Sequence, residues 1–201
     1  MPLQPYIEPA ETEELPGDLS VEDFLQAFLV GLTGLSGQMV RAKFQTEVPK
    51  EPPSILVNWL AFTIKDGVPD ANAYVWTDPL DTLGTTVNSQ RHEVLDVGVS
   101  IYGPLALDIY ATIRDGLQIP QNLQALTAAN MGLVEIFPSR KLPEPVNERF
   151  YNRVETTIIL RREVIRTYRV PSLLSARGTI RAQAGTDPDY SLDWNSENVE
   201  N

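Results

Sequence analysis

The sequence contains no cysteine, no long apolar run and only one histidine, and each of these absences excludes a class of protein or site. Without cysteine there is no disulfide, no thiol nucleophile and no cysteine-ligated zinc ion. No stretch of about 18 consecutive apolar residues occurs, so no membrane-spanning helix is expected. The first residues lack the basic start and apolar stretch of a signal peptide, which predicts a protein made and used in the cytoplasm.

The residues that could support catalysis or bind a metal ion do not form a motif. His92, the single histidine, precedes a predicted strand without any serine nucleophile motif, so a catalytic triad has no support. Asp187, Asp189 and Asp193 resemble a loose calcium loop, but the regular ligand spacing and the glycine of such loops are missing. The glycines form no phosphate-binding motif between a strand and a helix. We therefore predict a protein without enzymatic activity, cofactor or metal ion.

Basic residues are missing from both ends of the chain, whose net charge is −11. Seven acidic residues and no base precede residue 24, and five acidic residues and no base follow Arg181, which leaves +1 for residues 24–181. Acidic ends of this kind are usually solvated arms, and they argue against general binding to nucleic-acid phosphates.

Composition divides the chain into three parts. Residues 1–17 contain four prolines and several glutamates, which predicts an acidic extended arm. Residues 18–170 are predicted to form the core domain. Residues 171–201 are polar and acidic and lack an apolar period, which predicts a tail. Tyr6, Tyr190 and Trp194 lie in these two outer parts, where a free arm has no use for aromatic rings, so they are candidates for docking on a partner.

The clearest pattern lies in residues 94–117, where a strand leads into a helix. Apolar residues occupy every second position of residues 94–102, at Leu95, Val97, Val99 and Ile101, which predicts a strand with one buried face. Gly103 supplies backbone freedom for a corner, and Pro104 suits the first position of a helix over residues 104–117. The buried side of that helix is predicted from the four-residue spacing of Leu105, Ile109, Ile113 and Leu117.

Other segments complete an α+β fold. Ser20 and Asp23 form a capping box for an amphipathic helix over residues 24–35, and Pro120 starts a short helix that Gly132 ends, with Leu123, Leu126 and Met131 on one side. Strands are predicted over residues 39–45, 55–65, 73–77, 133–137 and 149–165, with residues 73–77 as the return strand of a hairpin. The predicted fold is a mostly antiparallel sheet packed by two main helices, with extended N- and C-terminal arms.

Positive charge concentrates on the last predicted strand. The arginines are Arg149, Arg153, Arg161, Arg162 and Arg166. One interpretation is a solvated sheet face or edge, where charge discourages unspecific pairing. The other is an interface between subunits, because arginine suits ion pairs with the acidic arms of neighbouring copies. Tyr102, before Gly103, is either a packing residue or part of that interface.

These segments resemble the tail terminator (neck terminator) proteins of long-tailed bacteriophages. The resemblance rests on the helix and strand over residues 24–45, the strand, Tyr102-Gly103 corner and helix over residues 96–117, and the arginine-rich strand over residues 148–160. It covers about residues 20–166 and leaves the acidic arm and the polar tail outside.

The resemblance implies a virion structural protein in the tail or neck, assembled in the host cytoplasm. Members of that family form a six-membered ring that caps the tail tube, ends its polymerisation and joins the tail to the head. The implied partners are other copies of the chain, the tail tube protein, the sheath where there is one, and the head connector, with DNA passing through the ring without specific binding. A head-completion or connector protein that binds the portal side is one alternative, and a small soluble enzyme or regulatory module is a more remote one.

Overall fold

The computed structural model describes residues 7–12, 20–43, 54–77, 86–146, 149–170, 175–182 and 190–197. The chain divides into two compact units, each described by itself. The larger unit comprises Thr12–Tyr74 and Gln90–Ile165, and the smaller one Met1–Glu11, Val75–Ser89 and Arg166–Asn201.

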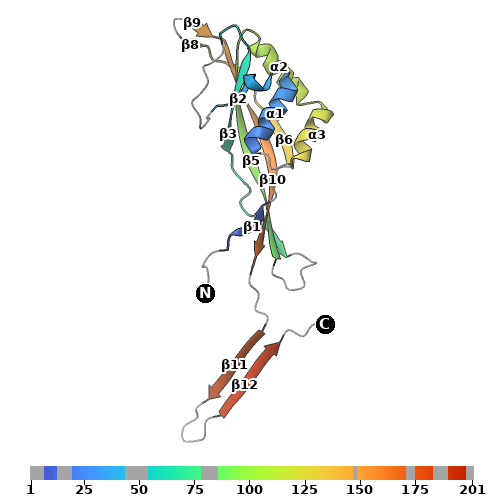
Figure 1. Cartoon of the computed structure of the whole chain (residues 1–201), viewed down its shortest axis with the longest axis vertical. Coiled ribbons are helices and arrows are strands. Elements are labelled where there is room, and N and C mark those ends of the chain that lie inside the picture. The colour runs from blue at the N-terminus through green and yellow to red at the C-terminus, as the bar shows by residue number, and fades with distance from the viewer. Residues whose placement is uncertain are drawn as a thin grey trace. The chain divides into compact units, whose positions relative to one another are not determined.

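The larger unit is built on a mixed sheet in which two 17-residue strands, β5 (Thr86–Tyr102) and β10 (Arg153–Arg169), lie side by side (Figure 1). β3 (Trp59–Asp66) pairs antiparallel with β5, and β2 (Val40–Ala42) pairs parallel with β3. On the other side, β6 (Met131–Ile136) and β7 (Arg140–Lys141) pair antiparallel with β10. The predicted mixed fold with a mostly antiparallel sheet is therefore confirmed, apart from the parallel β2–β3 pair.

Three helices pack on one face of this sheet (Figure 1). They are α1 (Val21–Thr33), α2 (Ala106–Gly116) and α3 (Pro120–Ala128), and a short 3₁₀ turn, η1 (Gly37–Met39), precedes β2. Leu25 and Leu29 of α1 and Ile113 of α2 are fully buried with Val97 and Val99 of β5. The period-two pattern of residues 95–101 thus faces the helices, as predicted.

The caps of α1 follow from the sequence. The Asp23 backbone N–H donates to the Ser20 hydroxyl at 3.1 Å, which satisfies one of the free amides of the first turn. Gly34 adopts a left-handed conformation with φ of 70° and ends the helix, because glycine carries no Cβ that would oppose it. The predicted capping role of Ser20 is confirmed, but the Asp23 carboxylate accepts from the Ser20 hydroxyl at 2.8 Å instead of from a helix N–H. The helix starts at Val21, before the predicted residue 24, and ends two residues before the predicted Leu35.

The start of α2 differs from the prediction. Pro104 and Leu105 lie in a turn before the helix, whose first residue is Ala106. Leu105 is 53% exposed instead of buried, while Ala106 and Tyr110 join Ile109 and Ile113 on the buried side. The four-residue spacing placed the apolar face correctly from Ile109 onward, but Leu105 precedes the helix and its side chain is free to point to solvent.

Several strand boundaries and pairings also need correction. β3 starts at Trp59 because residues 54–57 form a turn, closed by the Val57 N–H donating to the Ser54 carbonyl at 2.9 Å. β4 (Tyr74–Thr77) pairs with β5, so it is not the return strand of a hairpin with β3. α3 ends at Ala128, and Asn130, with φ of 53°, makes the turn that puts Met131 into β6 instead of the helix.

The predicted long last strand is interrupted once. β9 (Arg149–Tyr151) pairs with β8 (Glu144–Val146), and β10 follows after Asn152. The Asn152 carbonyl accepts from the Gly103 N–H at 3.1 Å, and the Asn152 side-chain amide donates to the Gly103 carbonyl at 3.1 Å. Asn152 therefore leaves the strand pattern because it binds the corner after β5.

The smaller unit contains β1 (Pro9–Thr12), whose residues are all exposed, and an antiparallel hairpin of β11 (Ser175–Ala182) and β12 (Tyr190–Glu197). The sequence reading did not predict this hairpin. Its ladder consists of backbone hydrogen bonds, which need no alternation of apolar side chains.

Candidate functional site

The face of the sheet opposite the helices carries the polar and aromatic side chains of the larger unit. They come from the positions that alternate with the buried ones, because successive side chains of a strand point to opposite faces. Trp59, Ala61 and Thr63 of β3 lie opposite Tyr102, Ser100 and Gly98 of β5. Arg153 and Glu155 of β10 extend the first two of these rows through contacts with Tyr102 and Ser100.

One of these rows is a ladder of cations and aromatic rings across four strands. The rings of Trp59 and Tyr102 stack with centroids 4.2 Å apart and planes 6° from parallel. The guanidinium of Arg41 in β2 lies 6.0 Å from the Trp59 ring, and that of Arg153 lies 5.6 Å from the Tyr102 ring. Cation–π and stacking contacts contribute about 0.5–1.5 kcal/mol each, so the row fixes the side chains of β2, β3, β5 and β10 to one another.

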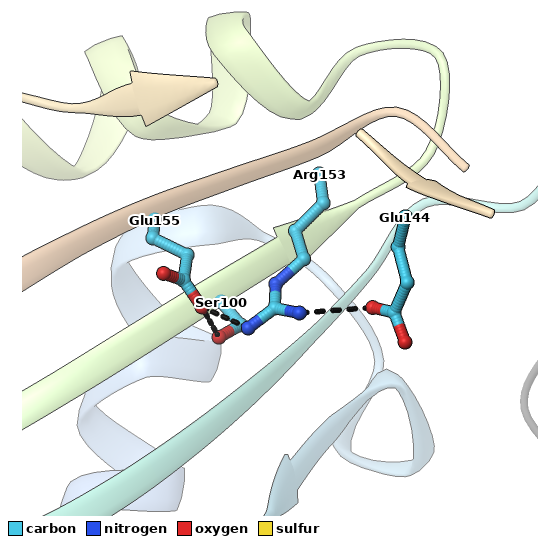
Figure 2. A network of polar contacts seen from close by, with 4 residues as sticks. All are labelled: Ser100, Glu144, Arg153 and Glu155. Carbon is cyan, nitrogen blue, oxygen red and sulfur yellow. Dashed lines mark hydrogen bonds and ion pairs between the residues drawn. The ribbon is translucent and has the colours of Figure 1, made fainter. Parts of the chain in front are cut away.

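Arg153 is also the centre of a polar network (Figure 2). Its guanidinium donates to Glu144 at 2.9 Å and to Glu155, and the Ser100 hydroxyl donates to the same Glu155 oxygen at 3.1 Å. Burial works against the charge of Arg153, but its hydrogen bond and attraction to Glu155, the ring of Tyr102 and Glu144 together raise its pKa. Arg153 is therefore engaged within its own subunit.

Two further groups of the network, Tyr102 and Glu155, are held in their ordinary charge states. Burial raises the pKa of Tyr102 above the usual 10.0, with Glu144 and Glu155 adding to it against Arg153, so the phenol stays neutral. Burial alone would raise the pKa of Glu155, but Arg153, Ser100 and Lys43 outweigh it and lower the pKa below 4.5. Neither group is poised as a general base or acid near neutral pH, and the network is suited to holding strands together.

The lowered pKa of Glu155 predicts a loss of stability in acid. A carboxylate whose pKa is lower in the folded chain stabilises the fold fully above its unfolded pKa, and this contribution disappears as the pH falls through the folded pKa. We expect the free energy of unfolding, measured in urea, to fall less steeply below the ordinary value of 4.5 in the Glu155→Gln variant than in the parent. Glu135→Gln on the exposed side of β6 is the control and should keep the parental slope. Equal slopes for all three proteins would contradict the assignment.

The Tyr102-Gly103 corner is closely packed from two sides. Gly103 has φ of +112°, and its backbone is bound to Asn152 as described above. From the other side, the Asn58 side-chain oxygen accepts from the Leu105 N–H at 2.9 Å. The corner therefore joins the turn at residues 54–58, the end of β5 and the start of β10, which lie far apart in the sequence.

A polar groove of about 470 Å³ lies on the same helix-free face. Its floor includes Thr63, Gly98, Ser100 and Glu155, and residues 137–140, between β6 and β7, form a wall. Lys43, Lys65 and Arg140 line it as cations. Among the described residues none of these three cations forms an ion pair.

The remaining predicted site residues are distributed over both units. Arg161 pairs with Asp70 at 2.9 Å and Arg162 with Glu93 at 2.7 Å, so both have partners within the chain. His92 lies 3.4 Å from Asp70 at a half-exposed position. Arg149 lies in β9, and Tyr190 and Trp194 lie in β12 opposite Ala182 and Gly178, but the side chains of these three residues are outside the described part, as is the whole of Tyr6.

Two exposed apolar surfaces were not predicted. The corner patch consists of Leu56, Val57 and Leu105, which the hydrogen bond between Asn58 and Leu105 brings together. The edge patch consists of Val134, Phe137 and Leu142 along the outer edge of β10. For the corner patch, residues 55–65 were predicted as a strand and Leu105 was assigned to the buried side of a helix. For the edge patch, residues 133–137 were predicted only as a strand, and Leu142 lies in no predicted helix or strand.

The described residues contain no group of three or more acidic or histidine side chains able to hold a metal ion. In the same part of the chain, no helix has the length and apolar character needed to cross a membrane. The larger unit presents a charged groove and exposed apolar patches, which are typical of the class of proteins that bind partners through their surfaces.

The comparison with protein families agrees with this class. Residues 19–183 match the phage neck terminator protein family, and the chain belongs to this family. Its role is therefore structural, in the tail or neck of a phage virion, among the other proteins of the tail and of the head–tail junction. A search of curated proteins gives no match.

Proposed function

We propose that this protein is the subunit of a six-membered ring that caps the phage tail tube, ends its polymerisation and joins the tail to the head connector. Membership of the neck terminator family over residues 19–183 is the observation that carries this proposal. A terminator works by shape, because a closed ring leaves no growing end for the next tube subunit.

The two apolar patches support a ring over a symmetric pair. A ring needs a heterologous interface, in which one surface of each copy meets a different surface of the next. The corner patch belongs to the elements around β3 and β5, whereas the edge patch follows the outer side of β10. Each patch exposes large apolar side chains that contact with a neighbour would remove from water, at about 25 cal/mol per Å².

The charge of the chain suits a channel for DNA. A net charge of −11 repels phosphates, so a ring of such subunits lets DNA pass without holding it. The tail tube protein, the sheath of a contractile tail and the head connector are the proposed partners. Arg149, Arg161 and Arg162, with Tyr102 and Arg153, remain candidates for the interface, and Tyr6, Tyr190 and Trp194 for docking on these partners.

The mass of the purified protein, alone and with tail tubes, tests the proposal. Light scattering should give six times the 22.4 kDa of one chain, or negative-stain images should show rings at tube ends only. Rings on isolated portal complexes in place of tubes would favour the connector function. A monomer that binds neither tubes nor portals would contradict the proposal.

A further inference from the structure

Cations outnumber anions among the residues that line the groove on the helix-free face. Of the charged residues that line it, Lys43, Lys65 and Arg140 are cations and Glu155 is the only anion. Glu155 is already bound by Arg153 from outside the lining and by Ser100 within it, and Lys43 also attracts it, which leaves Lys65 and Arg140 without an anion in the lining. Asp96 lies opposite Lys65 in the β3–β5 register, but no ion pair joins the two among the described contacts.

The shape of the groove fits an extended chain. Its floor runs across β3, β5 and β10, and it opens to solvent along the sheet. Hydroxyl groups of Thr63, Ser100 and Thr157 accompany the cations, so a polypeptide would find hydrogen-bond partners as well as charge. Gly98 adds no side chain to the floor of the groove, where a Cβ would stand 3.1 Å from the Thr63 methyl group.

The chain itself carries a segment of matching charge. Residues 13–18, which follow β1, contain Glu13, Glu14 and Asp18 and no base. This segment leads into α1, which packs on the opposite face of the sheet from the groove, and that favours the groove of another copy. Nucleic acid fits less well, because the chain as a whole repels phosphates.

We infer that the acidic segment of residues 13–18 of one subunit binds in the groove formed by Lys43, Lys65 and Arg140 of the next subunit. The inference rests on the proposed ring and adds to it a polar contact between neighbouring subunits. Because the contact is polar and open to solvent, it determines the order and direction of the subunits in the ring more than the affinity between them. The contact also weakens at high salt.

A zero-length carbodiimide crosslinker, which joins a lysine amine to a carboxylate in contact with it, tests the inference on assembled rings. Rings are formed from a mixture of unlabelled and ¹⁵N-labelled full-length chains, alone or on tail tubes. The expected products join Lys43 or Lys65 to residues 13–18 and include pairs of mixed isotope composition. Rings whose crosslinks are all within one chain, or join the lysines to acids after residue 181, or do not involve these lysines, would overturn the inference but leave the ring in place.

Charge exchange provides a second readout. Lys43→Glu with Lys65→Glu should raise the subunit concentration needed for rings about tenfold, and Glu13→Lys with Glu14→Lys in the same chain should restore it. Arg114→Glu, which changes an exposed cation on α2, is the control and should have no such effect. If the exchange does not restore assembly, the acidic segment is rejected as the occupant of the groove. The same follows if the parent binds duplex DNA and the variant with Lys43→Glu and Lys65→Glu has lost that binding. A parent protein that forms no ring under any condition would remove the proposed function and this inference together.

Discussion

Replacing Gly103 by alanine is expected to lower the free energy of unfolding by about 2–5 kcal/mol, because among the described glycines an added Cβ comes closest to its neighbours at Gly103. A Cβ at this position would stand 2.4 Å from the Asn58 side-chain oxygen and 2.7 Å from both the Asn58 Cα and the Val57 carbonyl. Two of these atoms belong to the backbone and cannot turn away. The φ of +112° adds strain for any residue with a side chain.

The control for this prediction is Gly132→Ala in β6. A Cβ at Gly132 meets nothing within 4 Å, so the same chemical change should alter stability by less than about 1 kcal/mol. Urea unfolding of both variants, followed by circular dichroism, measures the difference. A Gly103→Ala protein as stable as the Gly132→Ala protein would show that the turn at residues 54–58 moves freely, and that the corner does not fix it.

The second large effect concerns assembly. Leu56→Asp in the corner patch and Phe137→Asp in the edge patch should each abolish ring formation, because a carboxylate in an apolar interface loses its hydration without a partner. Both residues are exposed in the subunit, Leu56 at 76% and Phe137 at 43%, so the fold should remain intact. Light scattering should give a single chain for each variant, with the circular dichroism and unfolding midpoint of the parent. Val68→Asp, at an exposed position in neither patch, is the control and should still form rings.

Mixing the two variants separates a ring contact from a symmetric one. Each variant keeps the patch that the other has lost, so one intact interface forms and the mixture should give a pair of chains that cannot grow further. If instead each patch meets its own kind on the neighbour, each variant alone should retain a pair through its intact patch. Full rings from either single variant would show that the patches lie outside the interface.

The sequence by itself determined the elements whose signals are local. Ser20 and Asp23 fixed the start of α1, the alternation from Leu95 to Ile101 fixed the buried face of β5, and the proline at residue 120 fixed the start of α3. Element order, with the Tyr102-Gly103 corner, also pointed to the terminator family that residues 19–183 match. These signals were sufficient because caps, strand alternation and proline act within a few residues of the chain.

Only the tertiary structure decided which strands pair and what each exposed side chain meets. β4 pairs with β5 instead of β3, and β10 takes β6 and β7 on its outer side, because pairing depends on contacts between residues far apart in sequence. The same holds for Arg153, for which the sequence left open a solvated charge or an interface residue. Glu144 and the ring of Tyr102 meet Arg153 and Glu155 only when β5, β10 and the β8–β9 hairpin are brought together. Leu105, one residue outside a helix, is exposed for the same reason: periodicity gives the face of an element, and the fold decides where the element begins.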